Sequence, residues 1–146
     1  MRLQEVLRNK PDRLVTLPPT APVIQAAALM KMEGVGAVLV CDGRRRVLGL
    51  VSERDMALAV AVLGPELFEL CVGEMMTVGA PSASPTDAVQ NVMRIMTEQC
   101  VRHMPVIEDG VVVGIVSIGD VLKSRLAEKI QENAVLQDLA RARLPD

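Results

Sequence analysis

The sequence has almost no aromatic residues: it contains no tryptophan, no tyrosine and a single phenylalanine. Proteins that hold single-stranded nucleic acid usually stack its bases on aromatic side chains, so a stacking platform of that kind is excluded. The net charge is -2 and acidic and basic residues are interspersed, so the basic surface that binds a phosphate backbone is missing too. We therefore predict no nucleic-acid partner, and a core built from aliphatic residues and methionine.

Metal-binding and redox residues are also scarce. His103 is the one histidine, and the three cysteines, Cys41, Cys71 and Cys100, are far apart and form no C-x-x-C motif. This distribution is unlike a zinc site or a disulfide framework and predicts buried thiols in a reducing cytoplasm. No apolar run approaches 18 residues and the first residues do not resemble a signal peptide, so we predict neither membrane contact nor secretion.

Motifs of catalysis are missing as well. Ser52 and Ser117 do not lie in a G-x-S-x-G setting, and the single histidine would have to serve both serines. Neither the P-loop nor the dinucleotide-binding glycine pattern occurs. We predict a protein that is not an enzyme, with no catalytic residue, no catalytic cofactor and no metal.

The sequence does contain an internal repeat. Residues 23–40 align with residues 89–106, which lie 66 positions later (89 − 23). A G-x-x-S-x-x-D pattern then recurs at an offset of 65 (114 − 49), with Gly49, Ser52 and Asp55 in the first copy and Gly114, Ser117 and Asp120 in the second. We predict two copies of one unit, at residues 10–63 and 76–126, followed by a helical extension at residues 127–146.

Each unit has the same predicted order of elements, β-α-β-β-α. A stretch with apolar residues at helical spacing follows Pro22 or Pro85, and two short β-branched runs joined by a turn precede a second helix. The first strand is a short piece around Val15–Leu17 in one unit and Thr77–Val78 in the other. Because neither three-stranded sheet can cover both of its faces alone, we predict an α+β fold whose units pack through their sheets.

The last helix, predicted from Gly119 to about Ala142, is longer than its counterpart in the first unit. Its apolar residues fall near one stripe, at Leu122, Leu126, Ile130, Leu136 and Leu139. We favour packing of this stripe on the protein's own core. In the alternative, its distal half contacts a second subunit.

The repeated serine and aspartate have a structural and a functional interpretation. A serine that ends a strand, followed three residues later by an acid, is typical of a capping box. The same place offers an anion the backbone N–H groups and the positive dipole end of a helix, with the serine hydroxyl as a further phosphate contact. The carboxylates of Asp55 and Asp120 can each accept hydrogen bonds from the two hydroxyls of a ribose. The residues alone leave both interpretations open.

Arg102 and His103 break the symmetry of the repeat. They precede a strand of the second unit, where Gly36 and Ala37 stand in the first. Both basic side chains can contact a phosphate. We therefore expect two unequal clefts and, because both basic residues belong to the second unit, the stronger site at Asp120.

Together these motifs resemble a tandem pair of CBS domains, the module named after cystathionine beta-synthase, also called a Bateman module. The resemblance covers roughly residues 10–126 and rests on V-G-A-V-L-V, G-L-V-S-E-R-D, E-M-M-T, V-R-H-M-P-V and G-I-V-S-I-G-D. It is strongest to small stand-alone bacterial proteins with two such repeats. It implies two β-α-β-β-α units in a pseudo-twofold arrangement, two clefts between them, and a homodimer.

The resemblance also implies a ligand. Family members bind adenosine compounds such as AMP, ADP, ATP, NAD or S-adenosylmethionine, and some regulate an enzyme or a channel. A regulatory module that senses AMP, ATP or NAD is therefore implied, with an effector protein as a further partner. The alternatives are an S-adenosylmethionine-binding module and a dimeric interaction scaffold that needs no ligand.

Positions in this chain match the family's ligand contacts as follows. Asp55 and Asp120 match the aspartate that binds ribose, Ser52, Ser117, Arg54, Arg102 and His103 match phosphate contacts, and Thr16 and Thr77 match segments whose backbone contacts the adenine edge. One departure is the apolar run at residues 56–62, where close relatives often carry a tyrosine and a basic helix. This run is interpreted as a subunit interface or as packing that replaces a ligand contact.

Overall fold

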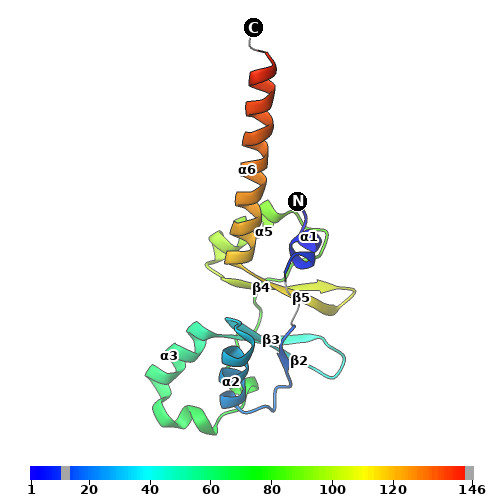
Figure 1. Cartoon of the computed structure of the whole chain (residues 1–146). Coiled ribbons are helices and arrows are strands. Elements are labelled where there is room, and N and C mark those ends of the chain that lie inside the picture. Colours follow the sequence, from blue (N-terminus) through cyan, green and yellow to red (C-terminus); the bar gives the residue numbers. More distant parts are fainter. Residues whose placement is uncertain (11–13, 144–146) are drawn as a thin grey trace.

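The computed structural model describes residues 1–10 and 14–143 and shows two similar units, each a small sheet with helices (Figure 1). The elements of the first unit are β1 (Thr16–Leu17), α2 (Val23–Glu33), β2 (Ala37–Cys41), β3 (Val47–Ser52), α3 (Glu53–Leu63) and the 3-10 helix η1 (Gly64–Glu69). Those of the second unit are α5 (Val89–Gln99), β4 (His103–Glu108), β5 (Val111–Ser117) and α6 (Ile118–Ala142). Two short helices, α1 (Leu3–Arg8) and α4 (Val72–Met75), precede the units. The predicted α+β class is confirmed.

The first helix of each unit shows the repeat directly. α2 begins at Val23 and α5 at Val89, so the two helices start 66 residues apart (89 − 23) and both have 11 residues. Both end at a residue in the left-handed conformation, with φ of 65° at Gly34 and 54° at Cys100. Glycine adopts this conformation without steric cost, whereas a residue with a Cβ does not. The turn at Cys100 therefore costs conformational energy that the turn at Gly34 does not.

The two sheets share one topology but differ in size. In the first unit β1 runs parallel to β2, which forms an antiparallel hairpin with β3. In the second unit β4 and β5 form the same hairpin. The place of β1 is taken there by a single residue, because Ala83 forms a parallel bridge to Val106, as Leu17 does to Val40.

The strand predicted at Thr77–Val78 does not belong to the second sheet. Thr77 instead forms a bridge with Leu50 of β3, through two backbone hydrogen bonds of 2.9 and 3.0 Å. The absence of a side chain at Gly49 permits this approach, since a Cβ there would lie 2.9 Å from the carbonyl oxygen of Thr77. The chain thus lies along the first unit before it enters the second.

α1 and α4 are exchanged between the units. α1 precedes the first unit but packs on the second, where the N–H of Leu3 donates to the carbonyl of Asp87 over 3.0 Å and both Leu3 and Val6 are buried. α4 precedes the second unit but packs on the first, where the N–H of Val72 donates to the carbonyl of Ala21 over 2.8 Å. Our sequence-based division placed α1 in neither unit.

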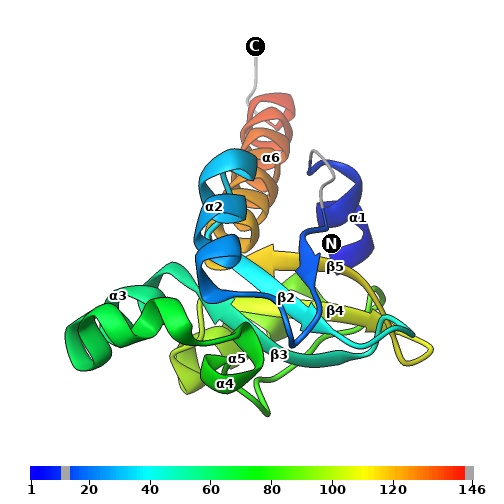
Figure 2. The same cartoon turned by 90° about the horizontal axis from the view of Figure 1, so that it is seen from below.

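An apolar cluster lies between the two sheets, in addition to one core in each unit. Its buried members come from β2, β3 and β5 and are Ala37, Leu39, Cys41, Leu50 and Val112. The views in Figures 1 and 2 show the sheets of the two units against each other. The predicted packing of the units through their sheets is therefore confirmed.

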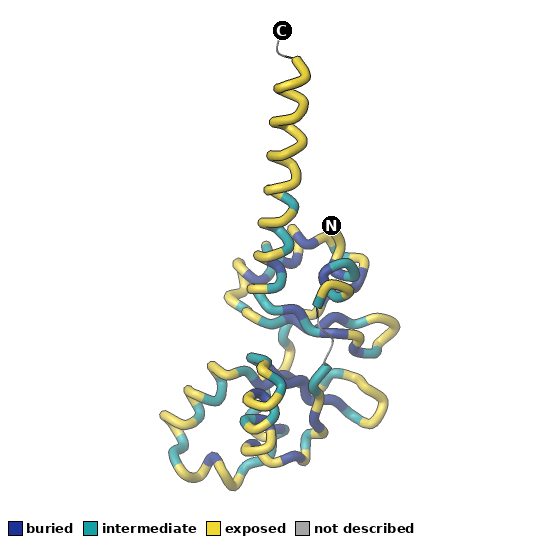
Figure 3. The backbone as a smooth tube through the Cα atoms, in the orientation of Figure 1, coloured by how far each residue is buried: buried dark blue, intermediate teal, exposed yellow. Residues whose placement is uncertain are grey.

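The helix α6 extends far beyond the body of the molecule (Figures 1 and 3). Of its 25 residues, all of which the structure describes, only Val121 is buried. The predicted stripe is exposed by 46% to 68% at Leu122, Leu126, Ile130, Leu136 and Leu139. The favoured prediction that this stripe packs on the protein's own core is thus wrong, because the helix leaves the sheet soon after its first turn.

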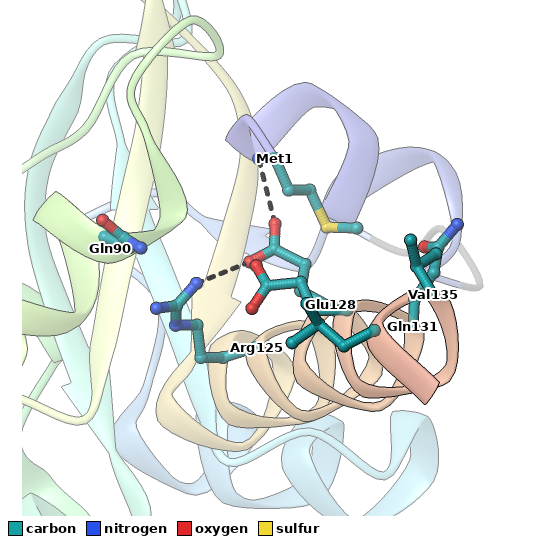
Figure 4. A pocket seen from close by; sticks show the side chains of 8 residues that line it. Met1, Gln90, Arg125, Glu128, Gln131 and Val135 are labelled. Carbon is teal, nitrogen blue, oxygen red and sulfur yellow. Dashed lines mark hydrogen bonds and ion pairs between the residues drawn. The ribbon is translucent and has the colours of Figure 1, made fainter. Parts of the chain in front are cut away.

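A network of charges joins the base of α6 to α1 and α5 (Figure 4). Arg125 donates to one carboxylate oxygen of Glu128 over 2.9 Å, and the amino group of Met1 lies 2.9 Å from the other. With its amide oxygen turned toward Arg125, Gln90 accepts from that guanidinium at 2.7 and 2.9 Å. These residues line a hollow of about 700 Å³ that includes none of the site residues predicted from sequence.

Candidate functional site

The two repeated motifs form the same local structure. Ser52 is the N-cap of α3: its hydroxyl accepts from the N–H of Asp55 at 3.1 Å, and its own N–H donates to Asp55 Oδ2 at 2.9 Å. Ser117 and Asp120 form both bonds at the start of α6 with the same two distances. The predicted capping boxes are confirmed, and each fixes a carboxylate at a helix N-terminus.

A cleft of about 380 Å³ lies at the N-terminus of α3 and is lined by both units. The first unit contributes Ser52, Arg54 and Asp55, and the second contributes Arg102 and His103. The other lining residues, several of them apolar, are Gly36, Leu50, Glu53, Leu58, Thr77, Ala80, Cys100 and Val101. We call this the Asp55 cleft. Its polar lining residues carry two carboxylates, two hydroxyls, two guanidinium groups and an imidazole. The repeat pattern did not predict its aliphatic walls.

A smaller cleft of about 170 Å³, the Asp120 cleft, lies at the N-terminus of α6. Ser117 and Asp120 face residues 34–37 of the first unit there. Arg102 lines the Asp55 cleft and not this one, so the expected pairing of Arg102 with Asp120 is wrong. The two units pack face to face, so Arg102 and His103, at the start of β4, lie opposite the N-terminus of α3 in the first unit. A prediction that considers each unit separately cannot show this.

His103 lies between the two clefts and lines both. A Cβ on Gly36 would lie 3.0 Å from His103 Nε2, so glycine at that position makes room for the imidazole. Burial, and then the positive charge of Lys10, lowers the pKa of His103 below its ordinary value against the opposing charges of Glu53 and Asp120. His103 is therefore mostly neutral at pH 7.

We expect the free energy of unfolding to fall as the pH is lowered from about 7 to 5. The unfolded chain takes up a proton on histidine near pH 6.5, whereas the folded chain does so only at a lower pH, so acid favours unfolding. His103 is the only histidine in the sequence, so a His103→Gln variant should lose this slope. Urea unfolding at a series of pH values measures it, and an equal slope in the variant would contradict the assignment.

Asp120 is paired with Lys10. The Lys10 ammonium lies 2.9 Å from Asp120 Oδ2 and also donates to the carbonyl of Ile115 over 2.8 Å. Burial acts to raise the pKa of Asp120, but the N–H of Ser117 and the charge of Lys10 together hold it below its ordinary value. Lys10 and Asp120 are 110 residues apart in the chain, so no local sequence pattern predicts the pair.

The two threonines expected near an adenine edge lie in different surroundings. Thr77 lines the Asp55 cleft, beside its bridge to Leu50. Thr16 is exposed in β1 and lines neither cleft, although its neighbour Val15 lines the Asp120 cleft. The predicted site residues are thus divided: Ser52, Arg54, Asp55, Thr77, Arg102 and His103 meet at one cleft, and Ser117 and Asp120 lie at the other with His103 between them.

Two further observations concern the part of the chain that the structure describes. Within residues 1–10 and 14–143, no group of three or more histidine, cysteine, aspartate or glutamate side chains is arranged to hold a metal ion. None of the helices in these two segments has both the length and the apolar character needed to cross a membrane.

The sequence model of the CBS domain matches this chain twice, over residues 5–62 and 72–127. The chain belongs to the CBS-domain family. The two matches include residues 5–8 of α1 and all of α4, the short helices that each pack on the opposite unit. The resemblance that the motifs indicated is thereby confirmed for the family.

Individual relatives resemble this CBS-domain protein over most of their length. The crystal structure of the CBS-domain containing protein ATU1752 from Agrobacterium tumefaciens is 35% identical, with a TM-score of 0.80, and the match covers 86% of this chain and 99% of that chain. The CBS domain-containing protein YhcV of Bacillus subtilis is 26% identical over 123 residues, covering 84% of this chain and 86% of YhcV. The predicted fold of two packed CBS repeats is confirmed by these similarities.

A third relative was solved with a ligand. The CBS domain protein PAE2072 from Pyrobaculum aerophilum, complexed with AMP, is 28% identical with a TM-score of 0.72, and the match covers 82% of this chain and 89% of that chain. A CBS-domain pair of similar sequence and fold therefore holds an adenosine nucleotide. This is consistent with a ligand-binding regulatory role for the present CBS-domain protein.

Proposed function

We propose that this CBS-domain pair is a regulatory module that binds an adenosine nucleotide in the Asp55 cleft. The observation that carries the proposal is the composition of the cleft, where a helix start of one unit faces basic residues of the other. Asp55 would accept hydrogen bonds from the ribose hydroxyls. The phosphate would be held by the N-terminus of α3 together with Ser52, Arg54, Arg102 and His103.

The base would lie against aliphatic rather than aromatic side chains. Leu50, Leu58 and Val101 line the cleft and supply an apolar wall for a flat ring. Thr77 lines the same cleft, and its carbonyl, which already accepts from Leu50, can accept a second hydrogen bond from the amino group of adenine. A cavity of about 380 Å³ falls within the range of small-molecule sites.

The two guanidinium groups of the cleft favour a phosphorylated ligand, although the carboxylates of Glu53 and Asp55 line the cleft as well. Arg54 and Arg102 supply guanidinium groups, which match phosphate oxygens in geometry and charge. AMP, ADP, ATP and NAD carry phosphates, whereas S-adenosylmethionine carries a positive sulfonium instead. We therefore rank AMP, ATP and NAD above S-adenosylmethionine, and the AMP complex of PAE2072 makes AMP the first ligand to test.

Titration of a nucleotide-stripped preparation tests the proposal. AMP, ATP, NAD and S-adenosylmethionine are titrated by calorimetry, and the melting temperature is measured with each. We expect the three phosphorylated compounds to raise the melting temperature, because a ligand selective for the folded state stabilises it by mass action. If no adenosine compound binds at millimolar concentration, the proposal is wrong.

A scaffold that needs no ligand is the second candidate. The observation in its favour is that both S-x-x-D motifs are fully used as capping boxes, which accounts for their residues without a nucleotide. The same titration separates the two candidates, since a scaffold shows neither heat of binding nor a thermal shift. Arg102 offers a further distinction, because a cap alone gives no reason for a guanidinium opposite the start of α3.

We also propose a homodimer that passes the ligand signal to an effector protein. Apolar side chains of α2, α3 and η1, among them Ile24, Val60 and Phe68, line one hollow, and these three are more than half exposed. Exposed apolar faces of this kind mark protein interfaces. Sedimentation velocity is expected to give a particle of two chains at micromolar concentration, and a monomer there would overturn the homodimer.

A further inference from the structure

The two clefts are built alike but hold different amounts of space. Both contain a serine N-cap and an aspartate three residues into the helix, with matching hydrogen bonds. The Asp55 cleft nevertheless measures about 380 Å³ and the Asp120 cleft about 170 Å³. Lys10 lines the smaller cleft, and it is the only lysine or arginine among the described residues that do so.

The position of Lys10 is set by the exchanged helix α1. Leu3 and Val6 of α1 are buried in the core of the second unit. Leu7 lies over Gly114 of β5, where a Cβ would come within 2.8 Å of a Leu7 methyl carbon. Lys10 lies three residues after Leu7. The packing of α1 on the second unit therefore places the Lys10 side chain at the N-terminus of α6.

The corresponding segment of the second unit, residues 76–80, has no charged side chain to bring to Asp55. Met76 lies over Gly49 of the first unit as Leu7 lies over Gly114 of the second. The residue three positions after Met76 is Gly79, which has a φ of 80°. The chain therefore brings an ammonium group to one repeated aspartate and leaves the corresponding space beside the other open.

We propose that Lys10 is an internal ligand of the Asp120 cleft, so that each chain takes up one nucleotide, in the Asp55 cleft. The inference rests on the proposed function. Asp120 Oδ2 already accepts a hydrogen bond from the Lys10 ammonium over 2.9 Å and another from the N–H of Ser117. A ribose would have to displace a partly buried ion pair that also holds the carbonyl of Ile115.

Counting the sites by calorimetry with AMP tests this inference. We expect one AMP per chain in the wild type and two in Lys10→Met, which keeps the length of the side chain and removes its charge. The double variant Lys10→Met with Asp120→Asn should return to one. Lys129→Met is the matched control, because Lys129 is in an exposed ion pair with Glu132 at 3.4 Å, and it should keep one site.

Each outcome has a definite meaning. Two AMP molecules in the wild type, or a folded Lys10→Met variant without an added site, would overturn the inference. Loss of a site in Lys10→Met would also overturn it, since Lys10 would then be a phosphate contact. If the wild type binds nothing but Lys10→Met binds one AMP, binding in the Asp55 cleft is wrong, and only the role of Lys10 as an internal ligand of the Asp120 cleft stands.

A second measurement needs no variant. Mild acetylation followed by mass spectrometry reports how accessible each lysine amine is. We expect Lys10 to react at least about fivefold more slowly than Lys31 and Lys129, because its ammonium is engaged by two acceptors. Saturating AMP should leave this protection unchanged. Rapid acetylation of Lys10, or its exposure by AMP, would contradict an internal ligand even if Lys10→Met does not fold.

Discussion

Replacement of Asp55 by asparagine is expected to weaken AMP binding roughly 10- to 100-fold, the scale of hydrogen bonds to a charged group. The carboxylate lies in the larger cleft, fixed at the start of α3 by Ser52, and asparagine keeps its shape but supplies one acceptor in place of two. Isothermal titration of the folded variant measures the loss. The variant should melt within a few degrees of the wild type, so that the loss can be assigned to binding.

Asp120→Asn is the matched control for this variant. It alters the same capping box on α6, with the same hydrogen-bond distances, but in the cleft that Lys10 fills. We expect AMP affinity to stay within about threefold of the wild type, because binding at Asp55 involves neither residue. A loss at Asp120→Asn as large as that at Asp55→Asn would restore the order of the two clefts that the repeat alone suggests.

Gly49→Ala is expected to lower the free energy of unfolding by about 1–3 kcal/mol, the usual cost of a group forced into filled space. An added Cβ would lie 2.6 Å from the Met76 sulfur and 2.9 Å from the carbonyl oxygen of Thr77. That carbonyl accepts a 3.0 Å hydrogen bond from Leu50, so it cannot move without breaking the bridge. Urea unfolding measures the change.

Gly114→Ala provides the comparison in the other repeat. The atoms nearest to its added Cβ would all belong to the Leu7 side chain, with one methyl carbon at 2.8 Å, and the end of that side chain can rotate away. The expected cost is therefore below about 1 kcal/mol. If Gly114→Ala destabilises the protein more than Gly49→Ala, the bridge between Thr77 and Leu50 is not the rigid contact that we describe.

Features that depend on neighbouring residues could be predicted from sequence. The capping boxes at Ser52 and Ser117 join residues three positions apart, so the S-x-x-D spacing is sufficient to indicate them. The helices starting at Val23 and Val89 and the hairpins that follow them are likewise determined by local periodicity and turns. Because of the repeat, the elements predicted for one unit also predicted those of the other.

Features that depend on the packing of the units could not be predicted in this way. Arg102 stands close to Asp120 in sequence but lines the cleft at Asp55, because opposite units meet at each cleft. Lys10 reaches Asp120 across 110 residues. The position of Arg102 and the contact of Lys10 were missed for the same physical reason. The repeat predicts the structure of one unit, but the surfaces at which two units meet depend on their mutual orientation.

The apolar stripe of α6 shows a different limit. Helical periodicity indicated correctly which residues share a face, but it carries no information on what covers that face. Leu126 and Ile130 proved to be exposed by 62% and 68%. Whether the face is covered depends on where α6 leaves the second unit, which the periodicity of the helix does not contain.

The exchange of α1 and α4 has a consequence for the order in which the molecule is made. Synthesis proceeds from the N-terminus at about 5–20 residues per second, so α1 emerges long before its partners around Asp87 and Gly114. The first unit, with α4, can be complete while Leu3 and Val6 still have no core to enter. α1 is thus made before both units but docks only once the second is present, and its docking brings Lys10 to Asp120.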